Sequence, residues 1–215
     1  MTKVDWEEKL SKCQEAFWKN NFEAYVVQST KEAEEVVLRD IIPRVHPASI
    51  SWGDSETLFA TGLIKEMKKL PGVEVVETFD EKGCEAANWE SVCRKALTVE
   101  LFLAGSNAIT ETGQLVNLDM VGNRVGGISF GPKFVVILVG RNKISNNLDA
   151  AVDRVRNYAA TTNAARHNLN TPCVKTGKCA DCSSPDRICN VWGIIEKSYP
   201  KGRIKMILIN EDLGL

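Results

Sequence analysis

Histidine is scarce in this sequence, which has only His46 and His167 among its 215 residues. His46 precedes a proline and is expected in a loop. His167 is expected at the end of a helix, where a cation interacts favourably with the helix dipole. The chain has no Ser-His-Asp set and no H-E-x-x-H motif. The common hydrolase mechanisms that depend on histidine are therefore disfavoured.

Long apolar runs and an excess of one charge are also lacking. The longest apolar run, 134–139, is far shorter than the roughly 20 residues that span a bilayer. Asp5, Glu7 and Glu8 interrupt any apolar stretch at the N-terminus, so we expect no signal peptide. A net charge of -1 gives no general attraction to nucleic acid or anionic membranes. We expect a cytoplasmic protein that neither spans a membrane nor binds nucleic acid.

Neither glycine-rich nucleotide fingerprint, G-x-x-x-x-G-K-[ST] or G-x-G-x-x-G, occurs in the chain. The glycines of the central region are Gly105, Gly113, Gly126 and Gly127. Glycines of this kind allow backbone amides to approach an anion. The pattern therefore favours an anion-binding loop of another type over a nucleotide-binding motif.

Apolar and amphipathic segments alternate along the chain, and 44% apolar content is ample for a core. Strands are expected at 22–27, 49–52, 73–76, 101–103, 134–139 and 203–210, with helices at 6–17, 29–41, 55–70, 84–97 and 148–166. The pattern Ser29 with Glu32 is a capping box, and Pro43 is expected to end that helix near Ile41. This order predicts a three-layer α/β fold with a mainly parallel sheet, in one domain over residues 1–215. An antiparallel excursion is expected around 114–130.

Polar residues and glycines are concentrated between the apolar runs 101–103 and 134–139. Such runs are typical of strands in a sheet that is covered on both faces. Ligands of open α/β sheets bind outside the carboxyl ends of strands, and the segment after residue 103 begins at such an end. We therefore expect the functional site within 103–140. The predicted ligand-binding residues are Asn107, Thr110, Gly113, Asn123 and Arg124.

Glu111 is the only carboxylate of the T-E-T-G turn at 110–113 and is the predicted catalytic residue. It would act as a base, and the alternative is a solvated turn residue. Arg124 is suited to bidentate binding of a carboxylate or phosphate, and its alternative is an intramolecular salt bridge. Asn107 and Thr110 would donate to a ligand oxygen or cap the turn.

Four of the seven cysteines lie in a loop at 171–190, with the spacing C-x5-C-x2-C-x6-C. They are Cys173, Cys179, Cys182 and Cys189. One tight pair with two outer cysteines close in sequence favours an iron–sulfur cluster over structural zinc. The alternative is a loop without metal whose outer cysteines pack as small hydrophobic residues. Cys13, Cys84 and Cys93 are expected to be thiols without chemistry.

Several motifs together resemble the LUD-domain family (DUF162), the group of lactate utilisation protein C. They are NAITETGQLVNLD at 107–119, GNR at 122–124, GPK followed by FVVILVG at 131–140, TGKCADCSSPDRICN at 176–190 and NEDLG at 210–214. The resemblance extends over about residues 5–215. It implies a fold similar to the NagB/RpiA/CoA-transferase-like group, in which Glu111 would be a nucleophile on an acyl group. The four-cysteine loop is similar to that of an anaerobe-type subgroup, whose substrate need not be lactate.

Two functions of different class follow from these features. In the first, the protein is a component of the utilisation of lactate or a related small organic acid. It would bind a small carboxylate or acyl ligand and act beside iron–sulfur and flavin oxidoreductase subunits, as the resemblance implies. In the second, it is a ligand-binding or regulatory module without catalysis, in which zinc is a structural element of the cysteine loop. A homodimer is compatible with both.

Overall fold

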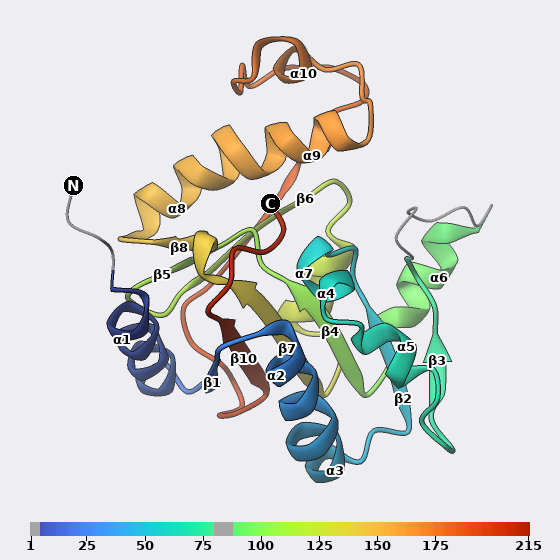
Figure 1. Ribbon diagram of the computed structural model, residues 1–215. Coiled ribbons are helices and arrows are strands. Elements are labelled where there is room, and N and C mark those ends of the chain that lie inside the picture. The colour runs from blue at the N-terminus through green and yellow to red at the C-terminus, as the bar shows by residue number, and fades with distance from the viewer. Residues whose placement is uncertain (1–4, 80–87) are drawn as a thin grey trace.

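The computed structural model describes residues 5–79 and 88–215, and within them six strands form a parallel sheet (Figure 1). The strand order is β1-β10-β7-β4-β2-β3, and every neighbouring pair is parallel. The strands are β1 Glu23–Val27, β2 Ser49–Trp52, β3 Glu74–Val76, β4 Leu101–Gly105, β7 Phe134–Gly140 and β10 Ile204–Ile209. The predicted mainly parallel sheet is confirmed.

Helices cover both faces of this sheet, so the expected three layers are present (Figure 1). One face packs against α1 Trp6–Lys19, α6 Trp89–Ala96 and α7 Asn123–Ser129. The other packs against α2 Thr30–Glu35, η1 Val36–Ile41, α3 Ile42–Val45, α4 Glu56–Ala60 and α5 Leu63–Met67. Strand β7 shows why two layers are needed. Val135 and Ile137 pack into the first core, whereas Val136 and Leu138 pack into the second, because successive side chains point to opposite faces.

A smaller second sheet has the order β8-β5-β6-β9. Its strands are β5 Ala108–Thr110, β6 Leu115–Asp119, β8 Ile144–Ser145 and β9 Val191–Ile195. β6 is antiparallel to both β5 and β9, so the antiparallel excursion expected around 114–130 is confirmed for its first part, whereas its second part forms helix α7. Against this sheet packs a long helix made of α8 Leu148–Arg154, η3 Val155–Ala159 and α9 Ala160–Arg166. In Figure 1 it lies between the small sheet and the loop that carries α10 Pro172–Thr176.

Two helix boundaries differ from the prediction. Ser29 Oγ accepts a hydrogen bond from Glu32 N at 3.2 Å, as expected of the cap, but helical structure continues past Ile41 to Val45. The π-helical turn before Pro43 has a wider hydrogen-bond spacing, which accommodates a ring that would clash in a regular helix. The expected helix at 55–70 is divided into α4 and α5, because Gly62 adopts a left-handed φ of 73°. Of the expected helix at 84–97, residues 84–87 lie outside the described residues.

Candidate functional site

A cavity of about 510 Å³ lies at the carboxyl ends of the central strands. Asp54, Ser55 and Glu56 follow β2, Ser106 and Asn107 follow β4, and Lys143 follows β7. The apolar lining includes Phe79, Trp89, Leu118, Met120, Val121, Val155, Ala159, Ala160, Leu169, Ile188 and Leu215. Parallel strands place their carboxyl ends together, so residues far apart in sequence meet in one cavity.

Lys143 is the most unusual ionisable residue of this cavity. It lies in the short turn η2 Arg141–Lys143 after β7, and only 5% of its surface is exposed. Its Nζ donates a hydrogen bond to Thr57 Oγ1 at 3.0 Å. Burial, with a smaller effect of the nearby cations Arg154 and Arg124, lowers the pKa of Lys143 to about 7, and Glu56 opposes this shift. No carboxylate of the described residues forms an ion pair with it, so Lys143 is a buried amine that is partly neutral near pH 7.

Arg124 is held by an internal ion pair in the cavity wall. Asp119 Oδ1 accepts from Arg124 Nε at 3.0 Å and from Nη2 at 2.8 Å, and both side chains are largely buried. Asp119 Oδ2 accepts from Val125 N at 2.6 Å, and Asn107 Oδ1 accepts from Arg124 Nη2 and from Leu118 N. Arg124 Nη1 has only a long contact of 3.5 Å, with Gly105 O. The guanidinium group is thus held in place by protein groups. Its Nη1 makes weaker hydrogen bonds than Nε and Nη2 do.

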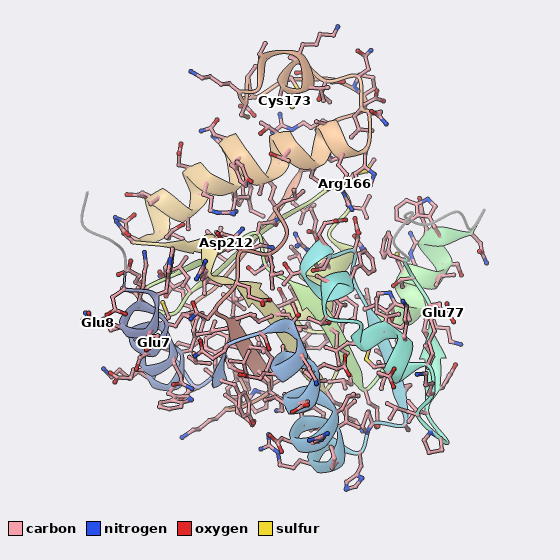
Figure 2. The ribbon with its side chains drawn as sticks, viewed as in Figure 1. Glu7, Glu8, Glu77, Arg166, Cys173 and Asp212 are labelled. Atoms are coloured by element: carbon pink, nitrogen blue, oxygen red, sulfur yellow. The ribbon has the colours of Figure 1, made fainter. Side chains whose placement is uncertain are left out.

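Arg166 connects the end of the long helix to the loop after β2. Its guanidinium nitrogens bond to Asp54 Oδ2 and Glu56 Oε1. Figure 2 shows Arg166 at the end of α9. The other oxygen, Asp54 Oδ1, is buried and accepts no hydrogen bond from the part of the chain that the structure describes. Because buried polar atoms usually have a partner, Asp54 Oδ1 is a candidate acceptor for a ligand donor.

The structure brings together only part of the predicted site. Asn107, Asn123 and Arg124 line the cavity. Thr110 and Glu111 do not line it, because the turn between β5 and β6 packs against α1 instead. Glu111 Oε1 lies 3.0 Å from Lys9 Nζ, and Thr110 Oγ1 accepts from Gln114 N at 3.0 Å.

Gly113 lies in the same turn. It has a φ of 82°, and a Cβ there would lie 2.8 Å from the backbone of Ala16 in α1. Its position is therefore explained by the close approach of this turn to α1.

The prediction did not include Asp54, Glu56, Lys143 or Arg166. The rule that ligands bind at the carboxyl ends of strands would have found three of them, including Glu56, which lies four residues beyond the expected strand 49–52. Asp54 follows the expected strand 49–52 as closely as Ser106 follows 101–103, and Lys143 is four residues beyond 134–139. Arg166 gave no such signal, because its approach to Asp54 depends on how the long helix packs.

The four cysteines of the loop at 171–190 are free thiols, each partly buried. Burial raises the pKa of the Cys189 thiol, Arg187 opposes this shift, and Cys179, Cys182 and Cys173 add to it. Arg187 donates to the carbonyl oxygens of Cys182 at 2.6 Å and Cys189 at 3.1 Å and so shapes the loop.

The thiols are not arranged as metal ligands. Within the described residues, no three Cys, His, Asp or Glu side chains are placed to hold a metal ion. The loop thus gathers the sulfur atoms without converging them on one point. Cys13 and Cys93 are buried thiols, and Cys84 lies outside the described residues.

The cysteine loop adjoins the cavity. Leu169 and Ile188 line the cavity, one at each end of the loop. Asn190 N donates to Asp119 O at 3.0 Å, and Asn190 Nδ2 donates to Met120 O at 3.1 Å. Asp119 is also the carboxylate that holds Arg124. Figure 2 shows Cys173 on the side of the long helix that faces away from the main sheet, and Arg166 at the end of that helix.

Comparison with known proteins agrees with this architecture. A family model described as the LUD domain matches residues 10–209, and the chain therefore belongs to the LUD-domain family. The crystal structure of a DUF162 family protein from Deinococcus radiodurans is similar, with 13% sequence identity and a TM-score of 0.52. The match covers 96% of this chain and 99% of that one, and it supports the fold alone. The comparison with curated proteins gave no match. None of the helices in the described ranges is long and apolar enough to cross a membrane.

Proposed function

We propose that this LUD-domain protein binds a small organic acid, or an acyl derivative of one, in the cavity at the carboxyl ends of β2, β4 and β7. It would do so as a component of the utilisation of lactate or a related acid. The observation that carries the proposal is the position of Lys143, a buried amine in the cavity wall without a carboxylate partner among the described residues. The link to lactate comes from the family alone.

The amine of Lys143 is the charged group of the cavity wall that favours an anionic ligand. Arg124 is paired with Asp119, and Arg166 is paired with Asp54 and Glu56. In the part of the chain that the structure describes, the Lys143 amine makes one hydrogen bond, to a neutral hydroxyl group. A buried ammonium without an anion is unstable, and a ligand carboxylate next to Nζ would stabilise it. Binding of an acid would thus complete a charge pair that the protein leaves open.

The cavity also has features that suit a hydroxy acid or a larger acyl group. Asp54 Oδ1 is a buried acceptor that a ligand hydroxyl group would satisfy. A volume of about 510 Å³ lies within the usual range for sites of organic ligands and exceeds the needs of a three-carbon acid. The apolar surface from the long helix would contact the remaining part of an acyl ligand.

We propose further that Cys173, Cys179, Cys182 and Cys189 bind an iron–sulfur cluster, with a zinc ion as the alternative. The support is their spacing in one loop. Binding would require the loop to rearrange so that the thiols converge. With a cluster, the protein would act beside iron–sulfur or flavin oxidoreductase subunits. With zinc, the cavity would belong to a binding or regulatory module, and either form is compatible with a homodimer.

Isothermal titration calorimetry tests the ligand proposal. Lactate, acetate and propionate would be titrated into the wild type and into the variants Lys143→Met and Lys69→Met. Lys69 lies on the surface in an exposed pair with Glu66, so its substitution controls for loss of a lysine. We expect Lys143→Met to weaken carboxylate binding about tenfold or more, the value of a charge-assisted hydrogen bond, and Lys69→Met to have no effect. Equal affinities in all three proteins would refute the proposal.

A further inference from the structure

We infer that Lys143 is a nucleophile whose Nζ forms an imine with the carbonyl carbon of a 2-oxo acid bound in the cavity. The inference rests on the proposed binding of a small acid and adds a covalent step and a substrate class to it. A 2-oxo acid carries both groups that this site would engage, a carboxylate and an electrophilic carbonyl carbon on the adjacent atom.

The position of Nζ suits this role. Lys143 lines the cavity, and its amine is held at a fixed point by Thr57 Oγ1 at 3.0 Å. Thr57 Oγ1 in turn donates to Leu213 O at 3.2 Å. The C-terminal segment packs closely over both groups, since a Cβ at Gly214 would lie 3.1 Å from Nζ and 2.6 Å from Thr57 Oγ1. The amine is therefore oriented before a ligand arrives, which favours attack on a bound carbonyl group.

Only a neutral amine can attack a carbonyl group, and in the free protein the surroundings of Lys143 make its amine easier to deprotonate than that of an ordinary lysine. Desolvation and the cations Arg154 and Arg124 lower the pKa of Lys143 to about 7, so that a much larger fraction of the molecules carries a free amine at neutral pH than for an ordinary lysine. An apolar pocket and neighbouring cations are the usual means of activating a lysine for imine formation. A surface lysine with an ordinary pKa would be almost fully protonated at this pH.

The charge balance selects a 2-oxo acid over a simple aldehyde or ketone. A protonated imine is a cation, and no carboxylate of the described residues is paired with Nζ. The carboxylate of a 2-oxo acid would be attached to the carbon that bonds to Nζ, so the ligand would supply its own counter-ion. A neutral carbonyl compound would leave this cation buried and unpaired, at a high cost in free energy.

The chemical step is balanced without any other reactant. The lone pair of Nζ attacks the carbonyl carbon, and the π electrons of the C=O bond move to its oxygen. The carbon–oxygen bond of the resulting carbinolamine then breaks as the C=N bond forms. The two protons of the neutral amine leave with that oxygen as one water molecule, and a proton taken up from the solvent converts the neutral imine to its protonated form, so nothing is oxidised or reduced.

Reductive trapping tests this inference. The wild type would be incubated with pyruvate, the simplest 2-oxo acid, and treated with sodium borohydride, followed by intact-mass measurement and peptide mapping. We expect one reduced pyruvate adduct, located on Lys143, and no adduct in Lys143→Arg, whereas Lys69→Arg should be modified like the wild type. Peptide mapping of the wild type gives the result even if Lys143→Arg does not fold.

Two outcomes overturn the inference, and they differ in what they imply. If pyruvate binds by calorimetry but no adduct forms, or if the adduct is spread over surface lysines, the imine is excluded while acid binding stands. If neither pyruvate nor lactate binds, the proposed function fails together with the inference.

Discussion

Lys143 Nζ donates a 3.0 Å hydrogen bond to Thr57 Oγ1, and this contact joins the end of β7 to α4 at the base of the cavity. Thr57 is completely buried and Lys143 nearly so. Since a hydroxyl group carries no charge, the contact orients the amine without neutralising it. The lysine therefore retains the ability to respond to an anionic ligand.

Substitution of Thr57 should weaken ligand binding. In Thr57→Val the ammonium group loses its hydrogen-bond acceptor, so the charged form becomes less favourable and the pKa of Lys143 should fall further. We expect the affinity for a carboxylate at pH 7 to decrease about fivefold, which corresponds to about 1 kcal/mol for one hydrogen bond. Calorimetry would measure this, with Thr98→Val as the control because the Thr98 hydroxyl is exposed. An unchanged affinity in Thr57→Val would argue against an ammonium–carboxylate contact.

Burial of Lys143 should also make stability depend on pH. The folded state lowers the pKa of Lys143 from 10.5 to about 7, so between these values the unfolded chain binds more protons. The free energy of unfolding should therefore rise with pH across this window through Lys143, despite the opposing effect of Glu56. Urea unfolding of the wild type and Lys143→Met from pH 7 to 10 would isolate this contribution. If the free energy of unfolding changed with pH in the same way in both proteins, Lys143 would have an ordinary pKa.

The Arg124–Asp119 pair should be important for stability. Asp119→Ala would leave a largely buried guanidinium without its carboxylate, a loss that typically costs about 3–5 kcal/mol. Glu66→Ala breaks the solvent-exposed pair with Lys69 and should cost less than about 1 kcal/mol. Urea denaturation of both variants gives the comparison. Similar losses of unfolding free energy in the two variants would mean that the buried pair stabilises the protein no more than the exposed pair does.

Metal analysis tests the cysteine loop. In protein purified without oxygen, we expect iron and acid-labile sulfide that are lost from the double variant Cys179→Ser, Cys182→Ser. Cys13→Ser is the matched control, because Cys13 is buried in the core away from the loop. Zinc without sulfide would support the alternative of a structural zinc site. If no metal is bound, the proposal for the loop is wrong and the cavity is the sole candidate site.

The main sheet and its two helical layers were predictable, because runs of β-branched residues such as 134–139 are separated by amphipathic segments. The general position of the site followed from the polar residues after β4. Strand β9 was missed, and its segment contains Gly193, a residue type that is depleted in strands. That glycine is required by packing, since a Cβ there would lie 2.7 Å from the Val125 side chain. Such a contact between distant segments leaves no signal in local sequence.

The residues of the site were also hard to predict, because contacts between distant segments determine which of them face the cavity. The turn with Thr110, Glu111 and Gly113 carries the residue types of a binding loop, but tertiary packing places it against α1. Lys143 is the reverse case. A lysine in a polar turn is normally solvated, so its residue type gave no reason to expect it in the cavity wall. Its burial depends on the C-terminal segment and on α4, which are 70 and 86 residues away in the sequence. Long-range contacts therefore decide which polar residues face the cavity.

The most direct test of the account is an NMR titration of Lys143 in protein labelled at the lysine side chains, with Lys143→Arg used to assign the signal. We expect Lys143 to titrate near pH 7 in the free protein, since burial, Arg124 and Arg154 outweigh Glu56. Lactate should raise this pKa, because a bound carboxylate stabilises the ammonium form. A pKa near 10.5 in the free protein, or a lowered pKa that lactate leaves unchanged, would contradict the claim that Lys143 forms a carboxylate-binding site.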